Sequence, residues 1–306
     1  MGVNFDLSIN VLSKEYKECI NSNNPKYLRS IPQDCSPKKF IEFCKAIYEK
    51  NNFINPKTNL NRIPKTIHQI WLGSKDPPYE YQTFQKSWKN KHLTWQYIIW
   101  NEEKIKAAFP EKLFNQKLFD HAKKQGNFAK MADIARYEII NKFGGLYVDC
   151  DCECIKSFDI LHQNYDFYSG LEHLQNGLVV GNALIGAKAN HPILEQCLFN
   201  IKEYEKKQAI DLHYWKGFSG YCPKVEKQYA LTLTITGPIL FTKSIWQKAD
   251  KDNNIDIIFP PTFFFPFPEY GEYETKAETF SCHYFKGIWK KDLLEKYKKH
   301  KQGESR

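Results

Sequence analysis

The sequence lacks an apolar run long enough to cross a bilayer. None of its windows approaches the ~18 uninterrupted apolar residues that a membrane-spanning helix requires. The first residues, MGVNFDLSINVLSKEYKE, include acidic side chains and have no apolar core of the signal-peptide type. Asp6 stands where the myristoylation pattern needs Ser or Thr. These absences lead us to expect a cytoplasmic chain, for which peripheral contact with a membrane stays open.

Paired Cys-x-x-Cys motifs, which hold structural zinc in many small domains, are also missing. The nine cysteines are an odd number, which does not suit a complete disulfide framework. In a chain without an export signal, we expect reduced thiols. No internal repeat is detectable.

The composition favours a folded enzyme. A content of 42% hydrophobic and 15% aromatic residues argues against a disordered or coiled chain. The net charge of +9 suits nucleic acid, an anionic membrane or a phosphorylated small molecule. Because much of this charge is scattered lysine, we interpret it mainly as solvated surface and expect no nucleic-acid partner.

The most informative stretch runs from Ala129 to Glu153 and joins a helix to a strand. Apolar residues from Phe128 to Phe143 recur at spacings of three and four, which predicts a helix with one buried side. Gly144 and Gly145 then end the helix. On this helix Asp133 and Arg136 are three residues apart and therefore neighbours on one surface, where a simple ion pair is the alternative to a binding role.

Residues 146–154 alternate with the period of a β-strand. Successive side chains of a strand point to opposite faces, so Asp149 and Asp151 would share one face. Cys150, Cys152 and Cys154 would share the other face and pack as small hydrophobic residues, although such a row also suggests a zinc or copper site. Two carboxylates on one face repel each other unless a cation lies near them, and their oxygens favour Mg²⁺ or Mn²⁺.

These residues resemble the DXD signature of one glycosyltransferase group. The group contains the yeast-type initiating α-mannosyltransferases, bacterial capsular polysaccharide sugar transferases and, more distantly, the large clostridial glucosylating toxins. Its pattern of Ser or Ala, Asp-Ile-x-Arg-Tyr, a helix and Gly-Gly-x-Tyr-x-Asp-x-Asp is matched by residues 132–137 and 144–151. A lone DXD is common by chance, whereas the whole string at fixed spacing is specific.

Further segments resemble the same group in the same order, so that the match covers roughly residues 63–290. Residues 63–73 resemble its opening strand, and residues 97–101 resemble its second strand, which ends in a Trp and a polar residue. Residues 283–289 resemble its closing His-His-Phe-x-Gly-Ser-Trp motif. Here the second His is Tyr284 and the Ser is Ile288, so a hydroxyl contact at that Ser position is absent.

The resemblance implies an α/β fold of GT-A type, with a Rossmann-like, mostly parallel sheet flanked by helices. In this interpretation residues 61–290 form the catalytic domain. Residues 1–60, which are polar and interrupted by prolines, form a small N-terminal helical extension. Residues 291–306 form a basic C-terminal tail or helix, for which exposure is the first interpretation and contact with an anionic membrane the second.

The resemblance also implies the roles of individual residues. The metal would be held by Asp149, Asp151 and His283, and the imidazole favours Mn²⁺ over Mg²⁺. The expected catalytic residues are Asp149, Asp151, Arg136 and Asn182. The expected donor-binding residues are Trp71, Asp133, Arg136, Tyr147, Asp149, Glu172, Lys286 and Trp289.

The function expected from these residues is a metal-dependent, retaining transfer of a sugar from a UDP- or GDP-sugar to a saccharide or glycoconjugate acceptor. Retention would proceed by front-face displacement, in which the leaving phosphate takes the acceptor proton. The first alternative is a toxin-like protein glucosyltransferase, which shares the donor-site residues. A remote alternative is a DxD phosphatase or phosphotransferase with Asp149 as nucleophile, but that loop requires Thr or Val where Glu153 stands.

Overall fold

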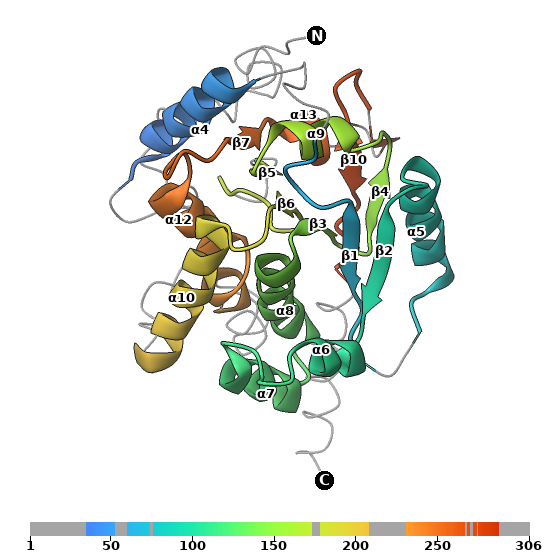
Figure 1. Cartoon of the computed structure of the whole chain (residues 1–306), viewed down its shortest axis with the longest axis vertical. Coiled ribbons are helices and arrows are strands. Elements are labelled where there is room, and N and C mark those ends of the chain that lie inside the picture. Colours follow the sequence, from blue (N-terminus) through green and yellow to red (C-terminus); the bar gives the residue numbers. More distant parts are fainter. Residues whose placement is uncertain are drawn as a thin grey trace.

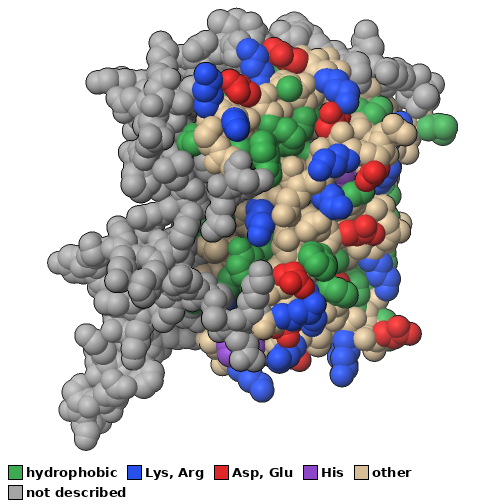
Figure 2. Space-filling model, turned by 90° about the vertical axis from the view of Figure 1, so that its left-hand side faces the viewer, with side chains coloured by type: hydrophobic (Ala, Val, Ile, Leu, Met, Phe, Trp, Pro, Cys, Tyr) green, Lys and Arg blue, Asp and Glu red, His purple; other side chains and the backbone are tan. Residues whose placement is uncertain are grey.

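A computed structural model describes residues 35–52, 60–73, 76–172, 178–207, 231–266, 268–269, 272–273 and 275–287 of the chain. A central sheet lies among helices on all sides in Figure 1. Figure 2 shows basic side chains interspersed with acidic ones over the face that it displays, as expected for scattered lysine. None of the described helices is long and apolar enough to span a membrane.

The central sheet has six strands in the order β2-β1-β3-β6-β5-β7. In this sheet only β6 runs antiparallel to its neighbours, because β1 pairs in parallel with β2 and β3, and β5 pairs in parallel with β7. This mixed but mostly parallel sheet confirms the expected α/β fold with helices on its flanks. The strands are β1 (Thr66–Ile70), β2 (Gln96–Trp100), β3 (Gly145–Val148), β5 (Phe167–Gly170), β6 (Leu184–Ala187) and β7 (Asp256–Phe259).

Helices cover the sheet and carry part of the site. The longer ones are α4 (Pro37–Asn51), α5 (Tyr79–Lys91), α7 (Gln116–Gln125), α8 (Phe128–Phe143), α10 (Pro192–Lys207) and α12 (Pro238–Lys248). The shorter ones are α6 (Glu102–Ala108), α9 (Asp159–Asn164) and α13 (Pro261–Phe264). Two small sheets pair β4 (Cys152–Cys154) with β10 (Ser281–His283), and β8 (Pro268–Glu269) with β9 (Glu272–Tyr273).

Helix α8 has the predicted bounds but a different environment. It begins after Asn127, whose side chain accepts a hydrogen bond from the Lys130 amide, and ends at Gly144. The prediction of a single buried side is wrong, because buried residues run almost without a break from Lys130 to Ile140. The helix packs against β1, β3, α7 and α10. Its polar residues, Asp133 and Arg136 among them, are therefore in the interior.

Two glycines let β3 start immediately after α8. Gly144 and Gly145 both have positive φ angles, of 64° and 108°. A Cβ at Gly145 would lie 2.6 Å from the Thr66 carbonyl oxygen on β1. Only glycine fits this close approach without strain.

The prediction of one continuous strand over residues 146–154 is wrong. Strand β3 ends at Val148, the chain turns at residues 149–151, and β4 joins a different sheet by pairing antiparallel with β10. The Asp149 amide donates to the Ala183 carbonyl at 2.8 Å, and the Cys152 amide donates to the Asp149 carbonyl at 3.1 Å. These bonds turn the backbone out of the central sheet, so the simple alternation of faces does not hold across the turn.

The described part of the N-terminal region packs on the central core. Helix α4 begins with Ser36 as its N-cap and contacts β7. The Asn51 side chain donates to the Asp256 carbonyl at 2.7 Å. Phe40 of α4 belongs to the same buried cluster as the strands of the sheet. The boundary at residue 60 stays a prediction, and residues 1–34 and 291–306 lie outside the described residues.

Two buried histidines are held in their neutral form. His68 accepts from the Trp100 indole and donates through Nε2 to the Gly144 carbonyl, both at 3.0 Å. Burial lowers the pKa of His68 to about 4, although its bond to Gly144 opposes the shift. His162 lies between the Ile63 carbonyl and the Tyr168 hydroxyl, and burial lowers its pKa to about 3.

We predict that these two histidines make the folded chain less stable in mild acid. Because their pKa values fall on folding, the unfolded chain takes up protons first, and stability declines as the pH drops below about 6.5. Urea unfolding at pH 7.5 and pH 5.0 should show a contribution of about 2 kcal/mol from each histidine. His68→Gln should remove about that much of the pH dependence, whereas His121→Gln, at an exposed position, should leave it unchanged. An unaltered pH dependence in His68→Gln would contradict the assignment.

Candidate functional site

The site forms where the chain leaves the central sheet. Asp149 and Asp151 lie in the turn between β3 and β4, beyond the carboxyl end of β3. Ligands of such open sheets bind at this edge. The pairing of β4 with β10 brings His283 to the same turn from more than a hundred residues away in the sequence.

The three residues predicted to hold a metal converge. His283 Nε2 lies 3.2 Å from the Asp151 carboxylate and 4.0 Å from the Asp149 carboxylate. Asp151 and His283 are buried, at 9% and 7% exposure. A set of two carboxylates and one imidazole fits Mn²⁺ or Mg²⁺, since hard oxygen donors predominate.

The imidazole partly neutralises the two carboxylates. Burial alone lowers the pKa of His283, but the charge of Asp151 and its hydrogen bond, together with Asp149, raise the pKa above its usual value. Burial alone raises the pKa of Asp151, but the charge and hydrogen bond of His283 lower it overall. The imidazole therefore lies against both carboxylates, and a divalent cation would bind at this same place.

The backbone of the closing segment fixes Asp151. The Lys286 amide donates to the Asp151 carboxylate at 2.8 Å, and the Tyr284 amide donates to the Asp151 carbonyl at 3.0 Å. The Lys286 ammonium lies 3.2 Å from Glu80 on α5, so Lys286 meets Asp151 through its backbone only. Its role toward phosphate stays a prediction.

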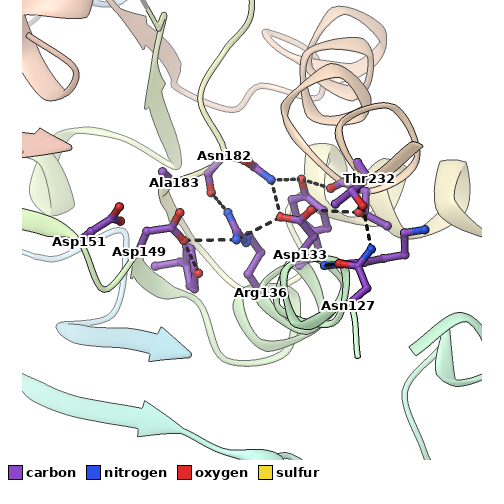
Figure 3. Close-up of polar contacts among 12 residues, drawn as sticks. Asn127, Asp133, Arg136, Asp149, Asp151, Asn182, Ala183 and Thr232 are labelled. Carbon is purple, nitrogen blue, oxygen red and sulfur yellow. Dashed lines mark hydrogen bonds and ion pairs between the residues drawn. The ribbon is translucent and has the colours of Figure 1, made fainter. Parts of the chain in front are cut away.

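Asp149 is held from the opposite side by α8 and β3. Its carboxylate accepts from the Tyr147 hydroxyl at 2.6 Å and lies 3.2 Å from the Arg136 guanidinium (Figure 3). The guanidinium also lies over the Tyr147 ring, 4.5 Å from its centroid. Tyr147 is 1% exposed, so its buried side chain holds Asp149 through the hydrogen bond and Arg136 through the ring contact.

Arg136 joins three segments of the chain. It lies 3.1 Å from the Asp133 carboxylate and donates to the Asn182 carbonyl at 2.5 Å, in addition to its contact with Asp149. Burial raises the pKa of Asp133 to about 6, and Arg136 and Thr236 oppose that shift. Asp133 is therefore mostly ionised at neutral pH. A simple Asp133–Arg136 ion pair does not describe these contacts fully, because the guanidinium also contacts Asp149.

Asn182 completes this cluster. Its amide nitrogen donates to Asp133 at 3.0 Å and to the Tyr137 hydroxyl at 3.1 Å. The Thr236 hydroxyl donates to the other Asp133 oxygen at 2.9 Å, and the Tyr137 hydroxyl donates to the Thr236 carbonyl at 2.8 Å. The structure thus adds Tyr137 and Thr236 to the predicted residues. Tyr137 ends the Asp-Ile-x-Arg-Tyr segment that resembles the family, and this position was the available signal for it.

A cavity of about 620 Å³ lies at the ends of β1 and β2. Trp71 lines it and packs against Tyr81, with ring centroids 5.5 Å apart. Burial raises the pKa of Tyr81, and the charge of Asp151 contributes to the shift. Sequence reasoning missed Tyr81. Other residues that line the cavity are Gln85, Lys86, Lys89, Asn101 and Lys104.

Glu172 and Trp289 are the remaining residues predicted for the donor site. Glu172 is buried, its amide donates to the Val179 carbonyl at 2.9 Å, and its charge helps to raise the pKa of His283. Trp289 lies outside the described residues. For all of the named site residues, contact with a donor stays a prediction.

Comparison with known proteins relates this part of the chain to a family. Residues 78–168 match the family model described as glycosyltransferase sugar-binding region containing DXD motif. These residues are therefore similar to the DXD glycosyltransferase region. The resemblance seen in the sequence is thereby confirmed, and the DXD of the family is the Asp149–Asp151 turn.

Relatives of this DXD glycosyltransferase region include two yeast proteins. One is inositol phosphoceramide mannosyltransferase 3 of Schizosaccharomyces pombe, 28% identical over 69% of this chain and 53% of its own length. The other is mannosyl phosphorylinositol ceramide synthase SUR1 of Saccharomyces cerevisiae, 28% identical over 67% of this chain and 48% of its own length. The chain thus spans about half the length of these curated relatives. A solved structure titled PaToxG glycosyltransferase is 17% identical, with a TM-score of 0.47 over 72% of this chain and 78% of its own.

The expected cytoplasmic location is wrong in view of these relatives. Their names refer to ceramide lipids that carry phosphate and inositol. The expectation rested on the lack of an apolar run, which says nothing about the half of the relatives' length that this chain does not span.

We predict that Arg136 is essential to the stability of the cluster. Arg136→Met would leave the buried Asp133 carboxylate and the partly exposed Asp149 carboxylate without their cation, and the free energy of unfolding should fall by about 3–5 kcal/mol. Adding Asp133→Asn should restore part of the loss, because it removes one uncompensated charge. Urea denaturation measures both effects. As a matched control, Arg62→Met breaks the more exposed pair with Asp166 and should cost about 1 kcal/mol. Equal losses in the two single variants would contradict the prediction.

Proposed function

We propose that the chain transfers a hexose, mannose in the first instance, from a nucleotide-sugar donor to a glycoconjugate acceptor in a metal-dependent, retaining reaction. The observation that carries the proposal is the meeting of Asp149, Asp151 and His283 beside the buried Arg136 cluster. The DXD family match and the mannosyltransferase relatives support the transfer of a sugar and favour mannose.

The acidic turn would bind the diphosphate end of the donor. Asp149, Asp151 and His283 would hold Mn²⁺ or Mg²⁺, and the bound ion would neutralise charge that develops on the leaving diphosphate. The Lys286 and Tyr284 amides keep the Asp151 side chain and backbone in place. No reorganisation of Asp151 is then needed as charge develops.

The Arg136 cluster would bind the sugar. Asp133 and Asn182 are polar, buried and held in one orientation by Tyr137 and Thr236. Arg136 has a guanidinium Nε without a hydrogen-bond partner among the described residues. A planar guanidinium with a spare donor suits a phosphate or a sugar hydroxyl.

The cavity beside Trp71 would receive the nucleoside of a UDP- or GDP-sugar. Its walls combine an indole face with lysine and amide side chains, which suits a planar base joined to a diphosphate. Tyr81 packs against Trp71 at this cavity. One extended donor would reach from this base site to the sugar site.

The acceptor would be a glycan or a glycoconjugate, a glycolipid in the first instance. The lipid named in the two relatives supports this class, and an acceptor held in a membrane requires only peripheral contact by the enzyme. The transfer would retain the anomeric configuration by front-face displacement. This reaction needs no protein base, because the leaving phosphate takes the acceptor proton.

We predict that a nucleotide sugar stabilises the folded chain only when a divalent ion is present. A donor at 100 times its Kd should add about 2.7 kcal/mol to the free energy of unfolding. Thermal-shift measurements with GDP-mannose and with UDP-sugars, each with Mn²⁺ and with chelator, test this. Free mannose serves as the control and should produce no shift. A donor shift that persists in chelator would refute metal dependence, and the absence of any shift with all nucleotide sugars would refute the proposed function.

We predict that Asp151→Asn abolishes transfer while the fold survives. The amide keeps an oxygen that can accept from the Lys286 backbone but removes the charge that binds the ion, so kcat should fall by at least about 10²-fold. Donor hydrolysis, assayed by release of the nucleoside diphosphate, gives the rate. Asp120→Asn on the surface of α7 is the matched control and should retain full activity. Wild-type rates in Asp151→Asn would exclude the proposed metal ligand.

A further inference from the structure

A cysteine lies in the acidic turn beside the imidazole. Cys152 and His283 are directly opposite each other in the antiparallel pair of β4 and β10. Side chains at opposite positions share one face, with Cβ atoms about 5 Å apart. One ligand atom each from Asp151, Cys152 and His283 lies within 4.8 Å of the other two, and all three residues are buried. The prediction that the Cys152 thiol faces away from the carboxylates is therefore wrong, because the turn at residues 149–151 breaks the alternation.

His283 Nε2 is the ring nitrogen that lies beside the Asp151 carboxylate, at 3.2 Å. The Cys152 sulfur has a weak contact of 4.0 Å with the Ala183 carbonyl. Metal binding would therefore cost the thiol only a weak hydrogen bond.

The surroundings hold these side chains in place. The Trp88 indole donates to the Cys152 carbonyl at 2.8 Å, which fixes β4 against α5. The His283 ring lies 4.0 Å from the Phe285 ring and 5.9 Å from the Phe265 ring, measured between centroids. Rigid, apolar walls around converging ligands are typical of a preorganised metal site.

We propose that Asp151, Cys152 and His283 form a binding site for a thiophilic divalent cation of the Zn²⁺ class. Thiolate and imidazole donors select Zn²⁺ over Mg²⁺ and Mn²⁺, which prefer oxygen. On binding, the bond between sulfur and the metal forms as the thiol gives its proton to solvent. The three protein ligands leave a fourth position of a tetrahedral ion for water.

Neighbouring cysteines provide the contrast. The Cys150 thiol donates to the Ile70 carbonyl at 3.4 Å, and the Cys154 thiol donates to the Lys156 carbonyl at 3.1 Å. Cys154 is on the same strand as Cys152 and equally buried, at 3% and 1% exposure. In the described part of the chain, only Cys152 belongs to a cluster of this kind. Cys154→Ser is therefore a matched control.

The site shares Asp151 and His283 with the proposed transfer reaction. A thiophilic ion bound there would exclude the ion that the reaction needs, so Zn²⁺ should inhibit transfer measured with Mn²⁺, and Cys152→Ser should relieve the inhibition. This consequence rests on the proposed function. Metal binding itself requires neither a donor nor turnover and is tested separately.

The test is a Co²⁺ titration of the full chain, without nucleotide, in a background with Cys19→Ser and Cys222→Ser. These two residues lie outside the described residues, and their replacement removes other thiols from the titration. We expect one Co²⁺ per chain, with a sulfur-to-metal charge-transfer band in the near ultraviolet that Zn²⁺ abolishes by competition. Cys152→Ser should lose the band, and Cys154→Ser should keep it.

Affinity gives a second measure. Loss of a residue that only orients a ligand weakens metal binding about 10–100-fold, so loss of the thiolate should weaken Zn²⁺ at least about tenfold. Mn²⁺ affinity should change little in Cys152→Ser.

Cadmium NMR of the wild-type background reports a thiolate ligand without any substitution in the cluster, so the test does not depend on the folding of Cys152→Ser. A missing charge-transfer band in the wild type, a band that survives in Cys152→Ser, or a cadmium shift for oxygen and nitrogen ligands alone would overturn the proposal. A failed thermal shift with nucleotide sugars would leave it standing.

Discussion

The buried guanidinium of Arg136 is the interaction on which the rest of the site depends. It reaches from α8 to the Asp149 turn after β3 and to the Asn182 carbonyl before β6, so one side chain fixes three segments of the sheet edge. A buried cation needs paired charge, because its desolvation is costly. Asp133 and Asp149 supply that charge, and each is thereby held in one orientation. Stability and the arrangement of the polar groups therefore have the same origin.

The turn between β3 and β4 then converts a local motif into a site. If residues 146–154 formed one strand, Asp149 and Asp151 would lie about 7 Å apart along one face. Instead the chain leaves the central sheet and pairs with β10, which places an imidazole within 4.0 Å of both carboxylates. The antiparallel register also places Cys152, and not Cys154, directly opposite His283. One change of sheet thus creates both the carboxylate–imidazole set and the mixed thiol cluster.

Local features of the site were predictable from the sequence, because they depend on spacing within one segment. Asn127 and Gly144 bound α8, and the i,i+3 spacing places Asp133 beside Arg136. Features that depend on long-range register were not. Period-two alternation cannot show that a strand changes sheet after Val148, and it assigned Cys152 to the wrong face. The link between His283 and the acidic turn came from a family resemblance, since no local pattern connects residues so far apart. Tyr81 carried no signal, because an aromatic residue near the start of a helix is ordinarily part of the core.

Charge balance explains why the acidic turn is suited to a cation. The carboxylates of Asp133, Asp149 and Asp151 gather around Arg136 and His283, and the guanidinium lies beside Asp133 and Asp149. The deficit of positive charge lies at the Asp149–Asp151 end of the site, since Arg136 is already shared with Asp133 and Asn182. A divalent ion at that end would meet both carboxylates and His283 Nε2. Because Asp133 and Asn182 also hold Arg136, such an ion could bind and leave without rearrangement of the guanidinium.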